Sequence, residues 1–262
     1  MSLSPSHIKE LESAKKLLEK PSLAATISDA FGAPIEKGFR MLPWRWHMAV
    51  NDAARKSVEA ALDVALKTLG GSSPTTAVVP SNWWHKVAVG ATGAAGGAFG
   101  LPALAIELPL STTLMLRSIA DIARSEGSDL NLPGTRLECI QILALGGPSK
   151  KDDAAETGYF AVRAAMAKAV SEAATHVAQK GLSAKGSPVI VRFISQIASR
   201  FSIVVSEKAA AQAVPILGAL GGATINTLFI NHFQQIASGH FIVRRLEGLY
   251  GLDEVRRIYQ EL

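Results

Sequence analysis

Apolar residues recur at intervals of three and four positions in nearly every long segment of this chain, whereas alternating β-branched residues are almost absent. Such spacing gathers apolar side chains on one face of an α-helix, which has about 3.6 residues per turn. The segment from Trp44 to Leu69 shows the pattern, with Val50, Ala54 and Val58 on one face. Because 48% of the residues are hydrophobic, a core can form. We expect an all-α protein, folded as a compact multi-helix bundle.

Breaks in the pattern predict where the helices end. A glycine followed by a proline interrupts the pattern at residues 70–74, 127–133, 146–148 and 181–188. None of these breaks is long enough to be a free linker between domains. The expected helices cover residues 4–20, 44–69, 81–101, 109–126, 133–145, 152–180, 188–208, 209–238 and 253–261.

Two glycine-rich sequences resemble each other. Residues 93–98 read Gly-Ala-Ala-Gly-Gly-Ala, and residues 218–223 read Gly-Ala-Leu-Gly-Gly-Ala. Glycines at this spacing leave a helix face without side chains, so another backbone can approach closely at a cost of roughly 1 kcal/mol per glycine. We expect a central pair of packed helices and an internal pseudo-repeat, with a membrane-inserting hairpin as the alternative. The contact glycines are Gly93, Gly96, Gly97, Gly100, Gly218, Gly221 and Gly222.

Long stretches without charge require a test for membrane spans. Neither Val87 to Ile106 nor Ala209 to Val243 contains Asp, Glu, Lys or Arg. In the first, the few large apolar residues contribute about −0.3 to −0.6 kcal/mol each, which the many Gly and Ala residues cancel. We therefore expect helices inside the protein or at an interface. The charged N-terminus and the single cysteine, Cys139, favour a cytoplasmic location.

Tryptophans and basic residues indicate contact with a membrane surface. All four tryptophans precede apolar helices, and tryptophan favours the headgroup region, where lysine or arginine suits anionic lipid. Between residues 180 and 245 the basic residues outnumber the acidic ones, with Glu207 as the single carboxylate. The alternatives are core packing for the apolar stripe and a solvated face for the charges. The expected membrane contacts are Trp44, Trp46, Trp83, Trp84, Lys86, Arg244 and Arg245.

Several polar residues lie in apolar surroundings, where a charge must be paired or neutralised. Arg117 and Asp121 are four positions apart, so they can pair on one helix face. A core network that joins the two glycine-rich halves is one interpretation, and a ligand or catalytic pocket with Glu107 as base is the other. If the network is structural, Arg117→Ala should destabilise the protein. Its expected members are Glu107, Thr113, Arg117, Asp121 and Asn226.

Two groups of residues together resemble the EcsC family. The first comprises residues 93–102, then Glu107-Leu-Pro, then residues 117–123; the second comprises residues 215–226, followed by His240-Phe, Arg244-Arg-Leu and Tyr250-Gly. Glu107 stands where the family commonly has Asp. The resemblance covers about residues 42–259, so we expect an EcsC-like helical domain at 42–262 after an N-terminal helical extension at 1–41. It implies a cytoplasmic bacterial protein with no settled enzymatic activity.

Motifs for common enzymes are missing from the sequence. It has no phosphate-binding loop, dinucleotide fingerprint, His-Glu-x-x-His or nucleophile elbow. The six histidines are dispersed, so we expect no metal site and no cofactor, and an enzyme is the less favoured reading. The net charge of +5 comes without a motif that reads nucleic acid, so no nucleic-acid partner is expected.

We expect a protein that associates peripherally with anionic membranes at the inner face of the cell membrane. A lipid or acyl chain held between the helices, a membrane protein complex as partner and self-association are compatible with this reading. The alternative is a membrane-independent structural or adaptor protein that binds another protein. A hydrolase that uses Glu107 as base is the third reading.

Overall fold

The computed structural model describes residues 3–20, 22–32, 44–69, 100–147, 158–181, 186–213 and 215–262; at 44, 100–103, 215–221 and 223 it describes the backbone alone. This part of the chain is all helical, without a strand, as the apolar periodicity predicts. The helices are α1 (Pro5–Leu18), α2 (Leu23–Phe31), α4 (Trp44–Thr68), α6 (Gly100–Ser125), α7 (Pro133–Leu145), α8 (Gly158–Lys180), α9 (Pro188–Ala213), α10 (Pro215–Tyr250) and α11 (Leu252–Glu261).

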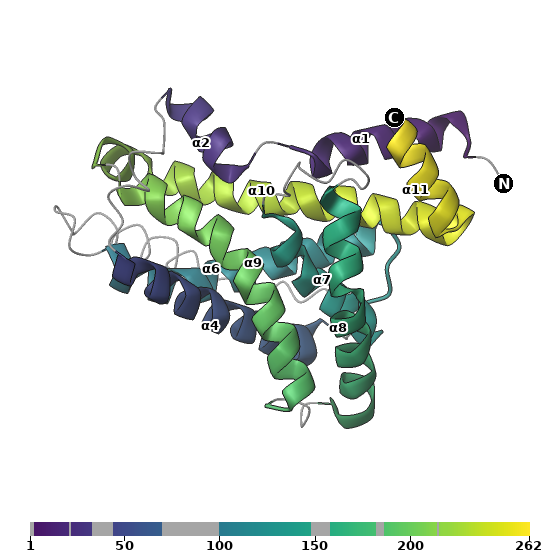
Figure 1. Cartoon of the computed structure of the whole chain (residues 1–262), viewed down its shortest axis with the longest axis horizontal. Helices are drawn as coiled ribbons and strands as arrows, with labels where there is room; N and C mark the ends of the chain where they lie inside the picture. The colour runs from purple at the N-terminus through teal and green to yellow at the C-terminus, as the bar shows by residue number, and fades with distance from the viewer. Residues whose placement is uncertain are drawn as a thin grey trace.

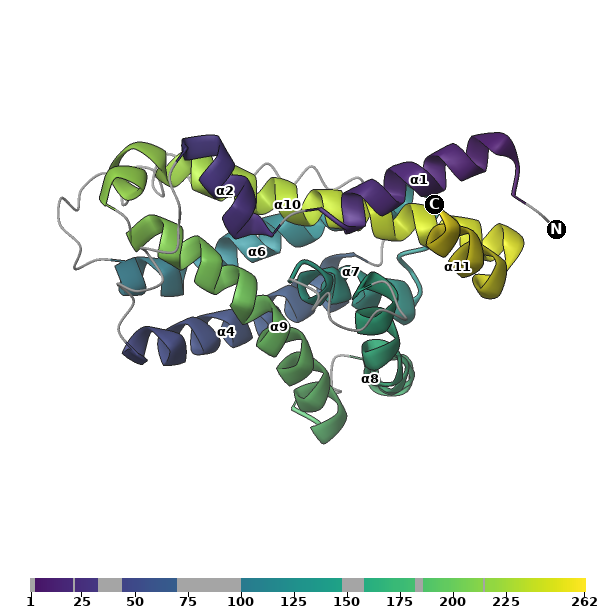
Figure 2. The same cartoon turned by 45° about the horizontal axis from the view of Figure 1, so that its top comes forward.

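Helix α10 is the axis of the bundle and runs along its length (Figure 1). Helices α1 and α2 lie along one side of α10, and α4 lies on the far side of the bundle, beyond α6 and α9 (Figure 2). Helix α11 turns back at the C-terminal end of α10, so both chain termini lie at the same end of the molecule. The middle of the bundle is therefore enclosed by helices from distant parts of the sequence.

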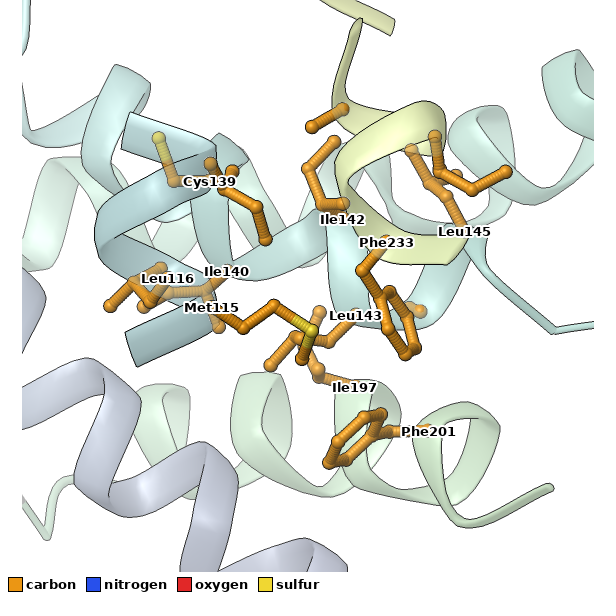
Figure 3. Packing of buried hydrophobic residues seen from close by; sticks show 14 of the residues in the cluster. Met115, Leu116, Cys139, Ile140, Ile142, Leu143, Leu145, Ile197, Phe201 and Phe233 are labelled. Carbon is orange, nitrogen blue, oxygen red and sulfur yellow. The ribbon is translucent and has the colours of Figure 1, made fainter. Parts of the chain in front are cut away.

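The core lies where α6, α7, α9 and α10 meet (Figure 3). Three phenylalanines form its aromatic part: the ring of Phe233 lies 5.6 Å from that of Phe201 and 5.2 Å from that of Phe229, between centroids. Cys139 is fully buried in the same core. Gly146 lies against the Phe233 ring, so closely that a Cβ at this position would overlap the ring. The end of α7 thus requires a residue without a side chain.

Helix α4 confirms the apolar stripe expected from the sequence. Val50, Ala54, Val58, Ala61, Leu62 and Ala65 are all buried. Its opposite face carries exposed charges that pair within the helix, such as Lys56 with Asp52. The stripe packs against α6 and α9, so here the periodicity serves the core of the protein.

Several helices differ from those expected. Helix α2 is not predicted by the sequence pattern, α9 continues beyond residue 208 to Ala213, and α10 runs from Pro215 to Tyr250 in place of 209–238. The helix expected to start at Pro109 starts at Gly100, with Pro109 inside it. An internal proline costs a helix about 3 kcal/mol. The buried Leu104 and Leu108 continue the same packed face as Met115, and this packing outweighs the cost.

Helices α6 and α10 pack against each other, and each is followed within two residues by a glycine. Gly127 has a φ of 79° and Gly251 a φ of 86°, the left-handed region that favours glycine. The glycine-rich copy at 218–223 forms the first turns of α10, whereas the copy at 93–98, with the helix expected at 81–101 up to residue 99, lies outside the described residues. The pairing of the two glycine-rich helices thus stays a prediction.

The N-terminal helix α1 depends on a close approach to α10. A Cβ on Gly239 would lie 2.7 Å from Cγ of Leu18 and 3.0 Å from the carbonyl oxygen of Ala14. His7 hydrogen-bonds Tyr250 at 2.8 Å, and Arg245 forms an ion pair with Glu10. Residues of the expected N-terminal extension are therefore packed onto the bundle.

Candidate functional site

A buried lysine joins three helices near one end of the bundle. Lys208 of α9 has a fully buried side chain, and its Nζ donates to Oε1 of Glu107 at 2.7 Å and to Oδ1 of Asn226 at 2.9 Å. The ring of Phe229 lies beneath the ammonium group, 4.7 Å from Nζ to the centroid. Glu107 belongs to α6, and Asn226 and Phe229 belong to α10. Lys208 therefore links the starts of α6 and α10 to the end of α9.

The charge of Lys208 depends on its partners. Burial lowers the pKa of Lys208, because an ammonium group away from water is poorly solvated, and the Glu107 carboxylate opposes this shift. The cation over the Phe229 ring adds a favourable contact. Glu107 is thereby engaged as the acceptor of an ion pair, an arrangement that suits structural support better than the role of a free general base.

Of the expected polar network, the structure brings together Glu107 and Asn226 through Lys208. Thr113 donates its hydroxyl to the carbonyl oxygen of Pro109 at 2.9 Å, within α6. Asp121 is exposed and pairs with Arg124 at 2.7 Å. In the described structure Asp121 pairs with Arg124 in place of the expected Arg117. Arg117 is half-buried, and the destabilisation expected for Arg117→Ala stays a prediction.

The expected membrane contacts divide into three groups. Trp46 is half-buried and packs against the core. Arg244 forms ion pairs with Glu138 and Glu247, and Arg245 forms ion pairs with Glu126 and Glu10, so both guanidinium groups have carboxylate partners within the protein and are only partly exposed. The side chain of Trp44, and Trp83, Trp84 and Lys86 altogether, lie outside the described residues.

Part of the basic excess of residues 180–245 is engaged in contacts within the protein, whereas Lys180 and Arg192 are exposed. Besides the paired Arg244 and Arg245, Lys208 is buried, and Nε of Arg200 donates to the carbonyl oxygen of Ala144 at 2.9 Å. Sequence reasoning placed these residues on a solvated or lipid-facing surface. For Lys208 the sequence held one indication of burial, since alanines follow it directly in an apolar helix.

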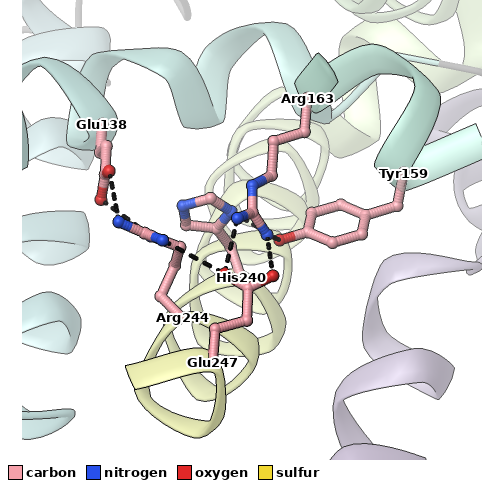
Figure 4. A network of polar contacts seen from close by, with 6 residues as sticks. All are labelled: Glu138, Tyr159, Arg163, His240, Arg244 and Glu247. Carbon is pink, nitrogen blue, oxygen red and sulfur yellow. Dashed lines mark hydrogen bonds and ion pairs between the residues drawn. The ribbon is translucent and has the colours of Figure 1, made fainter. Parts of the chain in front are cut away.

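The second polar cluster surrounds Arg163 of α8 (Figure 4). Its guanidinium donates to both carboxylate oxygens of Glu247, at 2.8 and 2.6 Å, in a bidentate pair. Tyr159 hydrogen-bonds both Arg163, at 3.3 Å, and Nδ1 of His240, at 2.9 Å. Glu247 also accepts from Arg244, at 3.1 Å. Sequence reasoning missed Tyr159, Arg163 and Glu247, because their partners come from helices distant in the chain.

His240 is the least satisfied member of this second cluster. Its ring is buried, and within the described structure its Nε2 has no hydrogen-bond partner. Burial lowers the pKa of His240 well below its ordinary value, and the charges of Arg163 and Arg244 lower it further. Burial also lowers the pKa of His232, although its Nε2 is 2.7 Å from the carbonyl oxygen of Gly146. Both rings are therefore neutral at neutral pH.

Acid should destabilise the fold through His240. The unfolded chain takes up a proton near the ordinary pKa of 6.5, whereas the folded protein keeps the ring neutral. Stability is thus complete above pH 6.5 and falls below it, by up to about 1.4 kcal/mol per pH unit for one histidine. Urea unfolding of the protein and of His240→Gln between pH 7.5 and 5.0 measures this slope. Equal slopes for the two proteins would contradict the assignment.

A cavity of about 670 Å³ opens beside the second cluster. The ends of α6 and α10 and the starts of α7 and α11 form its walls. Glu138, Arg244 and Glu247 line it and belong also to the cluster around Arg163. The remaining lining residues are Glu126, Gly127, Ser128, Leu132, Gly134, Thr135, Arg245, Gly248, Leu249 and Leu252.

Exposed apolar side chains mark the opposite end of α6, and we name Met48, Ile106 and Leu110 the apolar tip. Ile106 is 70% exposed and Met48 62%, whereas Asp121 and Arg124, on the later turns of α6, give that helix a charged surface. Helices α4 and α6 are neighbours whose C-terminal ends both approach the start of α7, since Arg136 donates to the carbonyl oxygen of Leu66. The starts of α4 and α6 therefore lie at the same end.

No group of His, Cys, Asp and Glu residues in the described ranges could hold a metal ion. Among the described helices, α9 alone is long and apolar enough to cross a membrane, and half of its most apolar stretch is buried inside the protein. The described architecture is that of an all-α bundle with internal ion-pair centres.

The sequence matches the EcsC protein family over residues 75–246, which is more than half of the chain. This protein belongs to the EcsC family. Comparisons with curated proteins and with solved structures find no match.

Proposed function

We propose that this protein associates peripherally with anionic membrane surfaces through the apolar tip, at the inner face of the cell membrane. The observation that carries the proposal is the exposure of Met48 near the start of α4 and of Ile106 and Leu110 in the first half of the neighbouring α6. Large apolar side chains exposed in a group, beside a polar remainder, are typical of surfaces that meet a partner or a membrane. The charge-free stretch from Val87 also ends at Ile106.

In this proposal, insertion of apolar side chains contributes more to membrane binding than basic residues do. Arg244 and Arg245 already have carboxylate partners, so they have little to gain from anionic lipid. The net charge of +5 still attracts the protein to an anionic surface. We therefore expect binding that decreases only modestly in 1 M salt, where screening shortens to about 3 Å. An acyl chain held inside the protein receives no support from the described cavity, whose lining includes five charged residues.

Flotation with vesicles that contain phosphatidylserine tests the apolar tip. The double change Ile106→Ser with Leu110→Ser should weaken binding about a hundredfold, because each inserted side chain contributes about 1.5 kcal/mol. Both residues are exposed, so the fold should tolerate the change, and circular dichroism checks this.

Leu132→Ser is the matched control, since Leu132 is an exposed leucine at the other end of the molecule. It should float as the unchanged protein does. If the unchanged protein does not float with anionic vesicles at low salt, the membrane proposal is wrong and the adaptor reading leads.

A further inference from the structure

The cavity near the end of α10 is lined by charged residues and by exposed leucines. Leu132 is 56% exposed and Leu249 58%, and Leu252 is exposed beside them. The charged residues that line the cavity are Glu126, Glu138, Arg244, Arg245 and Glu247. Its volume of about 670 Å³ falls in the range of sites that bind small ligands or a few side chains.

Carboxylates exceed guanidinium groups at this cavity. Three glutamates and two arginines line it; behind them, Arg163 pairs with Glu247 and Glu10 pairs with Arg245. One negative charge therefore remains after pairing. Arg244 and Arg245 each pair with two carboxylates, so an anionic ligand would have to compete with the protein's own glutamates.

Glu126 is the carboxylate best placed to receive a cation. It lines the cavity and remains partly exposed, and in the described structure Arg245 is its ion-pair partner, with Nε 2.8 Å from Oε2. A carboxylate has two oxygens and about four acceptor positions. Glu126 can thus accept a second charge-assisted hydrogen bond without losing Arg245, whereas Glu247 is buried and already accepts from two arginines.

We propose that this cavity binds a basic, aliphatic segment of a partner protein, with a lysine or arginine side chain at Glu126 and an aliphatic side chain against Leu132, Leu249 and Leu252. The excess carboxylate selects the cation, and the exposed leucines select the aliphatic neighbour. The cavity lies at the end of α6 opposite the apolar tip. Binding therefore does not depend on the proposed membrane association and is tested in solution.

Titration calorimetry with three hexapeptides tests this partner class. The probes are blocked peptides of alternating Leu and Lys, of alternating Leu and Glu, and of alternating Ser and Lys. The Leu/Lys peptide should bind at least tenfold more tightly than either of the others, because it alone supplies both features. Equal binding of the Leu/Glu peptide, or no binding of any peptide, would overturn the proposal.

Variants locate the bound peptide. Glu126→Gln should weaken binding of the Leu/Lys peptide about tenfold or more, since it removes a charged acceptor. Leu249→Ser with Leu252→Ser should weaken binding to a similar extent, and both leucines are exposed, so this change preserves the fold. Leu110→Ser at the apolar tip is the control and should bind normally. Binding that none of the cavity variants affects would place the peptide elsewhere and refute the site.

Discussion

Replacing Glu107 with alanine is expected to lower the free energy of unfolding by about 3–5 kcal/mol. The change leaves the ammonium group of Lys208 fully buried, and an uncompensated buried charge costs this much. For a chain of this size the melting temperature should fall by about 10 °C. Thermal unfolding followed by circular dichroism measures the effect.

Removing both charges tests whether the cost of Glu107→Ala comes from the unpaired charge of Lys208. Lys208→Met preserves most of the apolar volume beside Phe229, and the double change with Glu107→Ala should recover much of the lost stability, because no buried charge then remains. Glu59→Ala serves as the matched control, since Glu59 pairs with Arg55 on the surface of α4. A Glu107→Ala protein as stable as this control would show that Lys208 is not charged and buried as described.

Replacing Glu247 with alanine should also destabilise the protein by about 3 kcal/mol or more. Glu247 is buried and accepts both hydrogen bonds of the Arg163 fork as well as one from Arg244. Without it, the guanidinium of Arg163 has the hydroxyl of Tyr159 as its remaining described partner. Urea unfolding compares the two proteins.

Glu138→Ala is the control within the same cluster. Glu138 is partly exposed, and its partner Arg244 retains Glu247. Glu138→Ala should therefore lower the free energy of unfolding by only about 1 kcal/mol. If Glu138→Ala and Glu247→Ala lowered the free energy of unfolding equally, burial of the carboxylate would not determine the destabilisation. Changing Arg163 to methionine together with Glu247→Ala should cost less than Glu247→Ala alone, because the stranded charge is removed.

Sequence periodicity determined the fold class and most of the helices. The helix expected at 133–145 has the bounds observed for α7, and the stripe from Val50 to Ala65 is buried as predicted. These features are local, because each depends on neighbours three and four positions away in the same segment. Gly127 was recognisable as a helix end for the same reason, whereas the expected end at residue 238 was wrong, since α10 continues to Tyr250.

Tertiary structure alone decided which charges are internal. Lys208 and Glu107 are 101 positions apart, Arg244 and Glu138 are 106, and Arg245 and Glu10 are 235. The sequence identified Glu107 and Asn226 as polar residues in apolar segments, but it placed Lys208 and the two arginines on a surface. Only the packing of distant helices brings these partners together, because an ion pair depends on distance in space. Proline 109 remains inside α6 for a similar reason, since contacts with other helices outweigh its local preference to begin a helix.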